Sequence, residues 1–157
     1  MSQSLFYRIR TDKDVQWTGA IVQNAGANET ITVPWADAPL SLTLTGISVL
    51  SDQNLAWEFN FWNSALFGSS SNMDLDGWIG LWGFAAADGQ QIAATGNYRY
   101  YIDGLEIPLW NSSANGTSTM QELYVSLVNR SATSKNAGAT GEIVVTFHVQ
   151  AQQVGGA

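Results

Sequence analysis

The chain has no cysteine, a single histidine and few charged residues. The absence of cysteine excludes disulfides, thiolate metal ligands and cysteine nucleophiles. Charged residues make up 12% of the 157 residues, about half of the 25% or so that is usual in soluble domains. Neutral polar side chains must therefore cover most of the surface, and packing must supply most of the stability.

Basic residues are scarce, with 6 Lys and Arg against 13 Asp and Glu, which gives a net charge of −7. A chain with this charge repels a phosphate backbone and an anionic membrane surface. No apolar run approaches the roughly 20 residues that a membrane-spanning helix needs. We therefore expect neither a nucleic acid nor a membrane as partner.

The N-terminal sequence does not predict a secretory signal. Its basic residues, Arg8 and Arg10, follow the short apolar patch instead of preceding it, and Asp12 and Asp14 come soon after. We expect synthesis in a host cytoplasm without secretion. No internal repeat or linker divides the sequence, so residues 1–157 are interpreted as one domain.

Apolar and polar residues alternate with a period of two in segment after segment, which is typical of half-buried β-strands. The clearest cases are residues 55–61, 123–127 and 143–149. Further candidate strands are residues 5–10, 17–23, 29–34, 40–49, 78–84, 97–102 and 105–110. About ten short strands with turns between them predict an all-β fold, a single antiparallel β-sandwich of jelly-roll type, with a closed barrel as the alternative.

Two local features refine this prediction. The apolar phase within residues 40–49 slips at Thr45 and Gly46, which predicts a β-bulge there. The Asp103-Gly104 pair between two strand-like segments predicts a two-residue hairpin. Pro108 predicts an edge position, because proline cannot donate a hydrogen bond to a neighbouring strand.

Three segments are candidate contact regions. Residues 63–77 form the longest stretch without alternation, and such long loops are often functional. Residues 151–157 are predicted to be a flexible tail, and Ser2–Tyr7 a short flexible N-terminal arm.

No catalytic constellation emerges from the sequence. His148 falls on the polar face of the last predicted strand, which favours a solvated residue over a catalytic base. Glu58 near Trp62, with a second carboxylate from Asp103, Glu106 or Glu122, has the residue types of a glycosidase, but nothing fixes a pair at the required separation. We therefore expect a protein that is not an enzyme.

One segment begins like a calcium-binding loop, with Asn72, Asp74 and Asp76 at alternate positions followed by Gly77. The glutamate required twelve positions along is missing, since Gly83 stands there. A turn that closes the long loop is the favoured interpretation. We expect no cofactor, with this segment as a weak calcium candidate.

Seven tryptophans invite a sugar-binding interpretation, because aromatic faces stack on pyranose rings. Trp78, Trp82 and Phe84 share one parity, and together with Trp62 they could form an exposed platform or an interface. Large aromatic residues more commonly fill the core of a sandwich, and sequence alone does not assign the faces.

Residues 122–149 (ELYVSLVNRSATSKNAGATGEIVVTFHV) resemble the late jelly-roll strands, and the connection between them, in capsid decoration (cement) proteins of tailed phages. The segment from Tyr98 to Trp110 is compatible with the same family. The resemblance implies a small non-enzymatic β-domain that binds the outside of the expanded capsid and stabilises it against the pressure of the packaged DNA.

This resemblance predicts a bacteriophage structural protein located on the capsid surface of the virion. Its partners would be the major capsid protein and further copies of itself in a dimer or trimer. The alternative is a carbohydrate-binding module, or a lectin-like or tail-fibre receptor-binding domain, in which a glycan is the partner.

Overall fold

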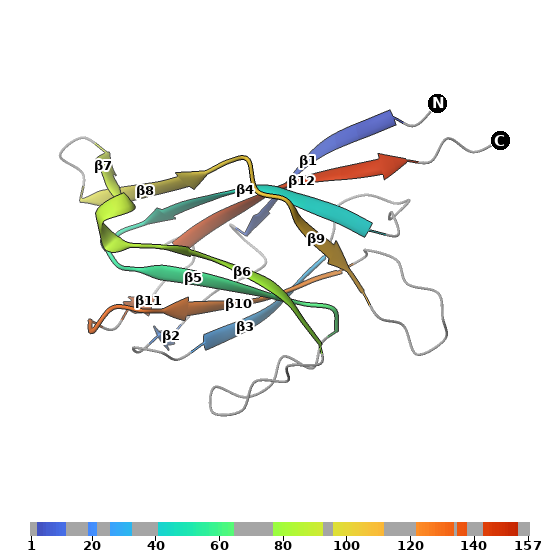
Figure 1. Ribbon diagram of the computed structural model, residues 1–157. Helices are drawn as coiled ribbons and strands as arrows, with labels where there is room; N and C mark the ends of the chain where they lie inside the picture. The colour runs from blue at the N-terminus through green and yellow to red at the C-terminus, as the bar shows by residue number, and fades with distance from the viewer. Residues whose placement is uncertain are drawn as a thin grey trace.

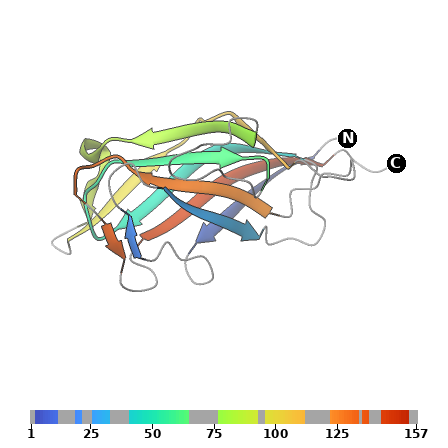
Figure 2. The ribbon, with the colours of Figure 1, turned by 90° about the horizontal axis from the view of Figure 1, so that it is seen from below.

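The protein is an antiparallel β-sandwich, seen edge-on in Figure 1 and from below in Figure 2. This computed structural model describes residues 3–11, 19–21, 26–32, 41–64, 77–92, 96–111, 122–133, 135–137 and 143–153. Two sheets of six and four strands face each other, and a two-stranded ribbon accompanies them. The predicted all-β sandwich is confirmed.

The six-stranded sheet has the order β1-β12-β4-β8-β7, and β9 also pairs with β4. Its strands are β1 (Gln3–Thr11), β12 (Ile143–Gln153), β4 (Ser41–Ser51), β8 (Asn97–Ile102), β7 (Gln90–Ile92) and β9 (Ile107–Trp110). The four-stranded sheet has the order β3-β10-β5-β6. Its strands are β3 (Gly26–Thr32), β10 (Glu122–Asn129), β5 (Trp57–Trp62) and β6 (Trp78–Phe84).

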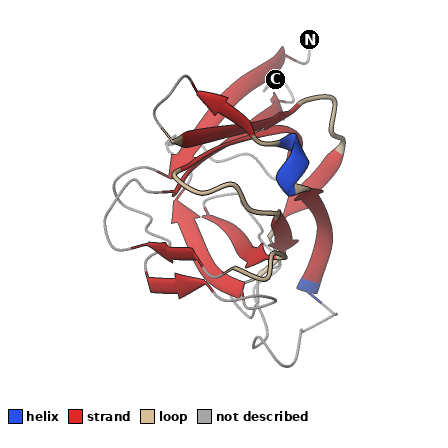
Figure 3. Cartoon of the chain, turned by 90° about the vertical axis from the view of Figure 1, so that its left-hand side faces the viewer, coloured by secondary structure: helices blue, strands red, loops and turns tan. Residues whose placement is uncertain are grey.

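Two smaller elements complete the described structure. The ribbon pairs β2 (Gly19–Ile21) with β11 (Lys135–Ala137). A 3-10 turn, η2 (Ala86–Asp88), connects β6 to β7 and is the coiled blue ribbon in Figure 3. The three-residue strands β7 and β11 were not predicted, because they are too short to carry an alternating pattern.

The antiparallel pairs are nested along the sequence. The first strand, β1, pairs with the last, β12, while β3 pairs with β10, β4 with β8 and β9, and β5 with β6. A nested set of pairs that wraps into two facing sheets is the topology of a jelly roll. This topology alternates β3, β4 and β5 between the two sheets and joins residues that are far apart in sequence.

The core lies between the two sheets and is built from the apolar residues that the alternation predicted. Trp57, Phe59 and Phe61 of β5 are fully buried, as are Val145 and Phe147 of β12. The ring of Phe147 meets those of Phe59 and Phe61 edge-to-face, with centroids 5.8 and 5.7 Å apart. Aromatic contacts of this kind hold the two sheets together.

The predicted bulge at Thr45 and Gly46 is confirmed. His148 pairs with Gly46 and Val149 with Leu44, so that Thr45 is the extra residue of β4. The bulge returns both Leu44 and Ile47 to the core, where each is fully buried.

The predicted hairpin at Asp103-Gly104 is wrong. Both β8 and β9 run antiparallel to β4 and pair with successive halves of that strand, so they do not pair with each other. Gly104 has a φ of +71° and forms a kink between two collinear strands. The kink lies beside the bulge, where the Leu105 amide donates to the Thr45 carbonyl at 2.9 Å.

Pro108 lies on β9. Among the described strands β9 pairs with β4 alone, so Pro108 occupies an edge strand, as predicted.

The predicted N-terminal arm and C-terminal tail overlap two described strands, β1 and β12. Residues 151–153 belong to β12 and pair with Leu5, Ser4 and Gln3 of β1, and Ala151 is buried. The ladder between β1 and β12 therefore continues into the predicted tail and arm. Residues 154–157 of the predicted tail and residues 65–76 of the predicted long loop lie outside the described residues. Residues on either side of this loop segment are hydrogen-bonded, since the Asn63 amide donates to the Gly77 carbonyl at 2.8 Å.

Candidate functional site

The four residues of the predicted aromatic platform do not form one exposed surface, because two of them are buried. Trp62 is only 2% exposed, and its indole N–H donates to Ser126 Oγ at 3.0 Å. Phe84 is 5% exposed and faces the core, where it contacts Phe59 edge-to-face. The platform as predicted is therefore wrong for Trp62 and Phe84.

The other two platform residues lie on opposite faces of β6. Trp82 pairs with Phe59, faces the core and is half-buried, with its ring against Phe84. Trp78 is 38% exposed on the outer face. A bulge near the start of β6, where the register shifts between Phe61 and Trp62, changes the face on which Trp78 lies. Shared parity in the sequence did not reveal this bulge.

A chain of hydrogen bonds crosses the same outer face. The Trp78 indole donates to Asn60 Oδ1 at 3.0 Å, and the Asn60 amide donates to Glu58 Oε1 at 2.9 Å. Arg130 donates to both carboxylate oxygens of Glu58, at 2.7 and 3.0 Å. These bonds fix the outer face as a rigid polar surface around Trp78.

The environment of Glu58 opposes a role as general acid. The Arg130 hydrogen bonds lower the pKa of the Glu58 carboxyl, against the smaller effect of burial. A glycosidase acid needs the opposite, a raised pKa. The predicted partner Asp103 lines a pocket on the outer face of the other sheet, so the structure does not bring Glu58 and Asp103 together.

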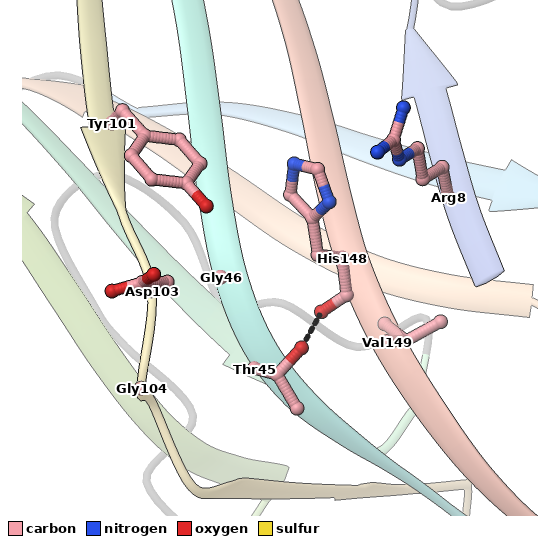
Figure 4. Close-up of a pocket in the computed structure, with 8 residues that line it drawn as sticks. All are labelled: Arg8, Thr45, Gly46, Tyr101, Asp103, Gly104, His148 and Val149. Atoms are coloured by element: carbon pink, nitrogen blue, oxygen red, sulfur yellow. Dashed lines mark hydrogen bonds between the residues drawn. The ribbon is translucent and has the colours of Figure 1, made fainter. Parts of the chain in front are cut away.

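The outer face of the six-stranded sheet holds a pocket of about 450 Å³ beside the bulge (Figure 4). Four strands bring its side chains together: Arg8 comes from β1, His148 from β12, Thr45 from β4 and Tyr101 from β8, with Asp103 directly after β8. Arg8 and His148 are direct cross-strand partners. The rings of Tyr101 and His148 meet edge-to-face with centroids 6.1 Å apart. We call this set the Tyr101 pocket.

Gly46 forms the floor of the Tyr101 pocket. It pairs with His148, and a Cβ atom at this position would lie 2.7 Å from the Ile102 carbonyl oxygen and 3.6 Å from His148 Cβ. The missing side chain thus lets β8 approach β4 and leaves open space between the imidazole and Asp103. Thr45 anchors the bulge, because its hydroxyl donates to the His148 carbonyl at 3.1 Å.

His148 lies on the outer face, as predicted, and is partly buried. Burial, with a smaller contribution from the Arg8 charge, lowers the pKa of His148 below its usual 6.5. The imidazole is therefore neutral at pH 7 and can both donate and accept a hydrogen bond.

Replacing Arg8 with glutamine is expected to raise the pKa of His148, because it removes a nearby positive charge. Burial remains, so the value should stay below 6.5. A pKa that is lower in the folded protein makes the unfolded chain bind more protons, so folding stability falls as the pH drops below 6.5. An NMR titration of the single histidine measures the pKa, with Arg99→Gln, at another exposed arginine, as control. An unchanged or lower pKa in Arg8→Gln would contradict the assigned cause.

The sequence pattern did not mark Arg8 and Tyr101 as site residues, and it indicated Asp103 and His148 only separately. The predicted bulge was the available signal, since bulges often lie next to functional sites.

The calcium candidates Asn72, Asp74 and Asp76 lie outside the described residues. Among the residues that are described, no group of three or more acidic or histidine side chains could hold a metal ion. The described part also contains no helix long and apolar enough to cross a membrane.

No family model and no curated protein matches the sequence. The chain is similar, over 95% of its length, to a chain in the structure of infectious bursal disease virus Gx strain, with 18% identity and a TM-score of 0.41. It spans 32% of that chain. It is also similar, over its whole length, to 86% of a chain of Desmodium yellow mottle tymovirus (6% identity, TM-score 0.32) and to 85% of one of turnip yellow mosaic virus (10% identity, TM-score 0.33). All three structures are of viruses.

Proposed function

We propose that this chain is a structural protein of a virus particle, and specifically a decoration protein that binds the outer lattice of a bacteriophage capsid. One observation supports this proposal most strongly: β6 exposes large apolar side chains and carries no charge. This strand is an edge of the four-stranded sheet, contains no charged residue, and exposes 38% of Trp78 and 46% of Leu81.

Edge strands of free proteins are usually protected by charge, proline or a covering segment, because an apolar edge pairs with other chains. In the described structure β9 lies close to β6 without forming a ladder with it, and the outer face of β6 stays exposed at Trp78 and Leu81. An exposed tryptophan and leucine on a surface made rigid by hydrogen bonds are typical of a protein interface. The bidentate pair of Glu58 with Arg130 leaves little unpaired charge beside them. This side of the molecule therefore suits a protein partner.

Two further points support a capsid partner. The residues that resemble phage decoration proteins include β10 and β12, which occupy opposite sheets as the late strands of a jelly roll do. The net charge of −7 disfavours nucleic acid and anionic membranes as alternatives. In this role the protein needs no catalysis, and each bound copy stabilises the assembled lattice by its binding free energy.

The decisive variant is Leu81→Asp, which places a charge in the proposed interface. We expect it to weaken binding to undecorated particles at least tenfold, because burying an unpaired charge at the centre of an interface costs about 2 kcal/mol or more. Binding is measured as copies retained per particle after sedimentation.

Leu50→Asp is the matched control, since Leu50 is 39% exposed but lies on β4 in the other sheet. It should leave binding unchanged. Equal binding of Leu81→Asp and the unmodified protein, with both folded, would contradict the assignment of β6 as the contact surface.

A further inference from the structure

The Tyr101 pocket is part of a longer groove. A second depression, of about 540 Å³, lies beside it on the outer face of the six-stranded sheet, and both are lined by Thr45 and Gly104. The second depression adds Thr43, Glu106 and Gln150 to the lining. Binding sites for small ligands usually measure about 300–1,000 Å³, so each depression is large enough for one.

The lining combines an open aromatic face with groups that bind hydroxyls. Tyr101 is 56% exposed, the highest value among the large hydrophobic side chains of the described structure. Its edge-to-face contact with His148 orients the ring. Around the ring, Arg8 donates hydrogen bonds, Asp103 accepts them and a neutral imidazole does both. The Thr45 hydroxyl, whose proton bonds to the His148 carbonyl, can accept a hydrogen bond.

The charges in the groove favour a neutral ligand. Within the Tyr101 pocket the charge of Arg8 is balanced by that of Asp103, and the second depression adds the carboxylate of Glu106. An anionic ligand would also meet the net charge of −7 of the whole chain.

The position of the groove argues against a peptide as ligand. Its central strands, β4 and β12, have neighbours on both sides, so they offer no free backbone edge for strand addition.

We propose that this groove binds a neutral glycan, with one sugar ring stacked on Tyr101 and the next residue lying along Thr45 and Gln150. A pyranose offers an apolar face to the tyrosine ring and hydroxyls to Arg8, Asp103 and His148. Gly46, which has no side chain, leaves room at the bottom of the pocket for the sugar ring that stacks on Tyr101.

The two proposed surfaces lie on opposite sides of the sandwich. If β6 faces the lattice, which rests on the proposed function, the outer face of the six-stranded sheet points away from the particle (Figure 2). A glycan site there would be accessible on a decorated particle and could attach it to a sugar-coated surface.

The test uses the isolated protein and its single histidine as a reporter. Methyl glycosides of glucose, galactose, mannose and N-acetylglucosamine, and disaccharides of the same sugars, are titrated to roughly 50 mM while the His148 imidazole signals are followed by NMR. Dissociation constants on the order of 1 mM are expected for such an open site. At least one glycoside should shift the signals saturably, its disaccharide should bind more tightly, and methyl glucuronide should bind more weakly.

Tyr101→Ala should abolish the saturable shift, whereas Trp110→Ala, at an exposed aromatic residue that lines neither depression, should retain it. No saturable shift with any neutral sugar, or full binding by Tyr101→Ala, would overturn the proposal. Because no particle is present, failure here is separate from failure of the proposed capsid role, which the Leu81→Asp experiment tests.

Discussion

The Phe147→Ala variant is expected to lose about 3–5 kcal/mol of unfolding free energy, the usual cost of deleting a buried phenylalanine ring. Phe147 is fully buried and contacts Phe59 and Phe61 across the interface between the sheets. For a chain of this size the loss corresponds to a fall in melting temperature of roughly 6–20 °C. Calorimetry or urea denaturation measures it.

Tyr101→Ala is the control for this prediction, because Tyr101 is mostly exposed on the outer face. Its effect should stay within about 0.5 kcal/mol. A loss of less than about 1 kcal/mol in Phe147→Ala would mean that the ring does not bridge the two sheets.

A methyl group at position 46 should also destabilise the fold. The Cβ atom of Gly46→Ala would lie 2.7 Å from the Ile102 carbonyl oxygen, which belongs to the backbone and cannot rotate away, so β8 must move away from β4. Overpacking of this kind costs about 1–3 kcal/mol. The urea midpoint should fall, and the shifted β8 should change the NMR signals of Tyr101.

Gly83→Ala provides the matched comparison within a strand. Its Cβ atom would lie 3.7 Å from the Trp57 carbonyl oxygen, an ordinary contact. Since alanine restricts the unfolded chain, this variant should be neutral or slightly stabilising. Equal midpoints for the two variants would show that β8 does not approach β4 closely at Gly46.

The period-two pattern predicted most of the fold because burial imposes it directly. Alternate residues of β5, β10 and β12 face a dry core, and their apolar identity is visible in the sequence. The bulge was predictable for the same reason, since the apolar phase had to slip where Thr45 was inserted.

The hairpin at Asp103-Gly104 failed because a local signal competed with a long-range one. A kink and a tight turn both use a glycine with positive φ, and Gly104 has one. Which of them forms is decided by β4, whose two halves pair with β8 and β9. That partner lies more than 50 residues away in sequence and leaves no local mark.

The site escaped prediction because its residues meet only in the folded sheet. Thr45 and His148 are joined by a hydrogen bond although 103 positions separate them. Trp62 was misassigned for a related reason: it lies on the polar face of β5, yet its indole bonds to Ser126 and it is 2% exposed. Alternation identifies the two faces of a strand but does not reveal what covers the outer one.

The proposed capsid role is tested most directly by the copy number of this chain in virus particles. Density-gradient-purified particles from the source are analysed by quantitative mass spectrometry, and the amount of this chain is compared with that of the major shell protein. We expect a ratio close to a simple fraction, because a decoration protein occupies symmetry-related lattice positions. Absence of the chain from the particles would contradict the proposed function, and a handful of copies would place it in the tail instead of on the capsid surface.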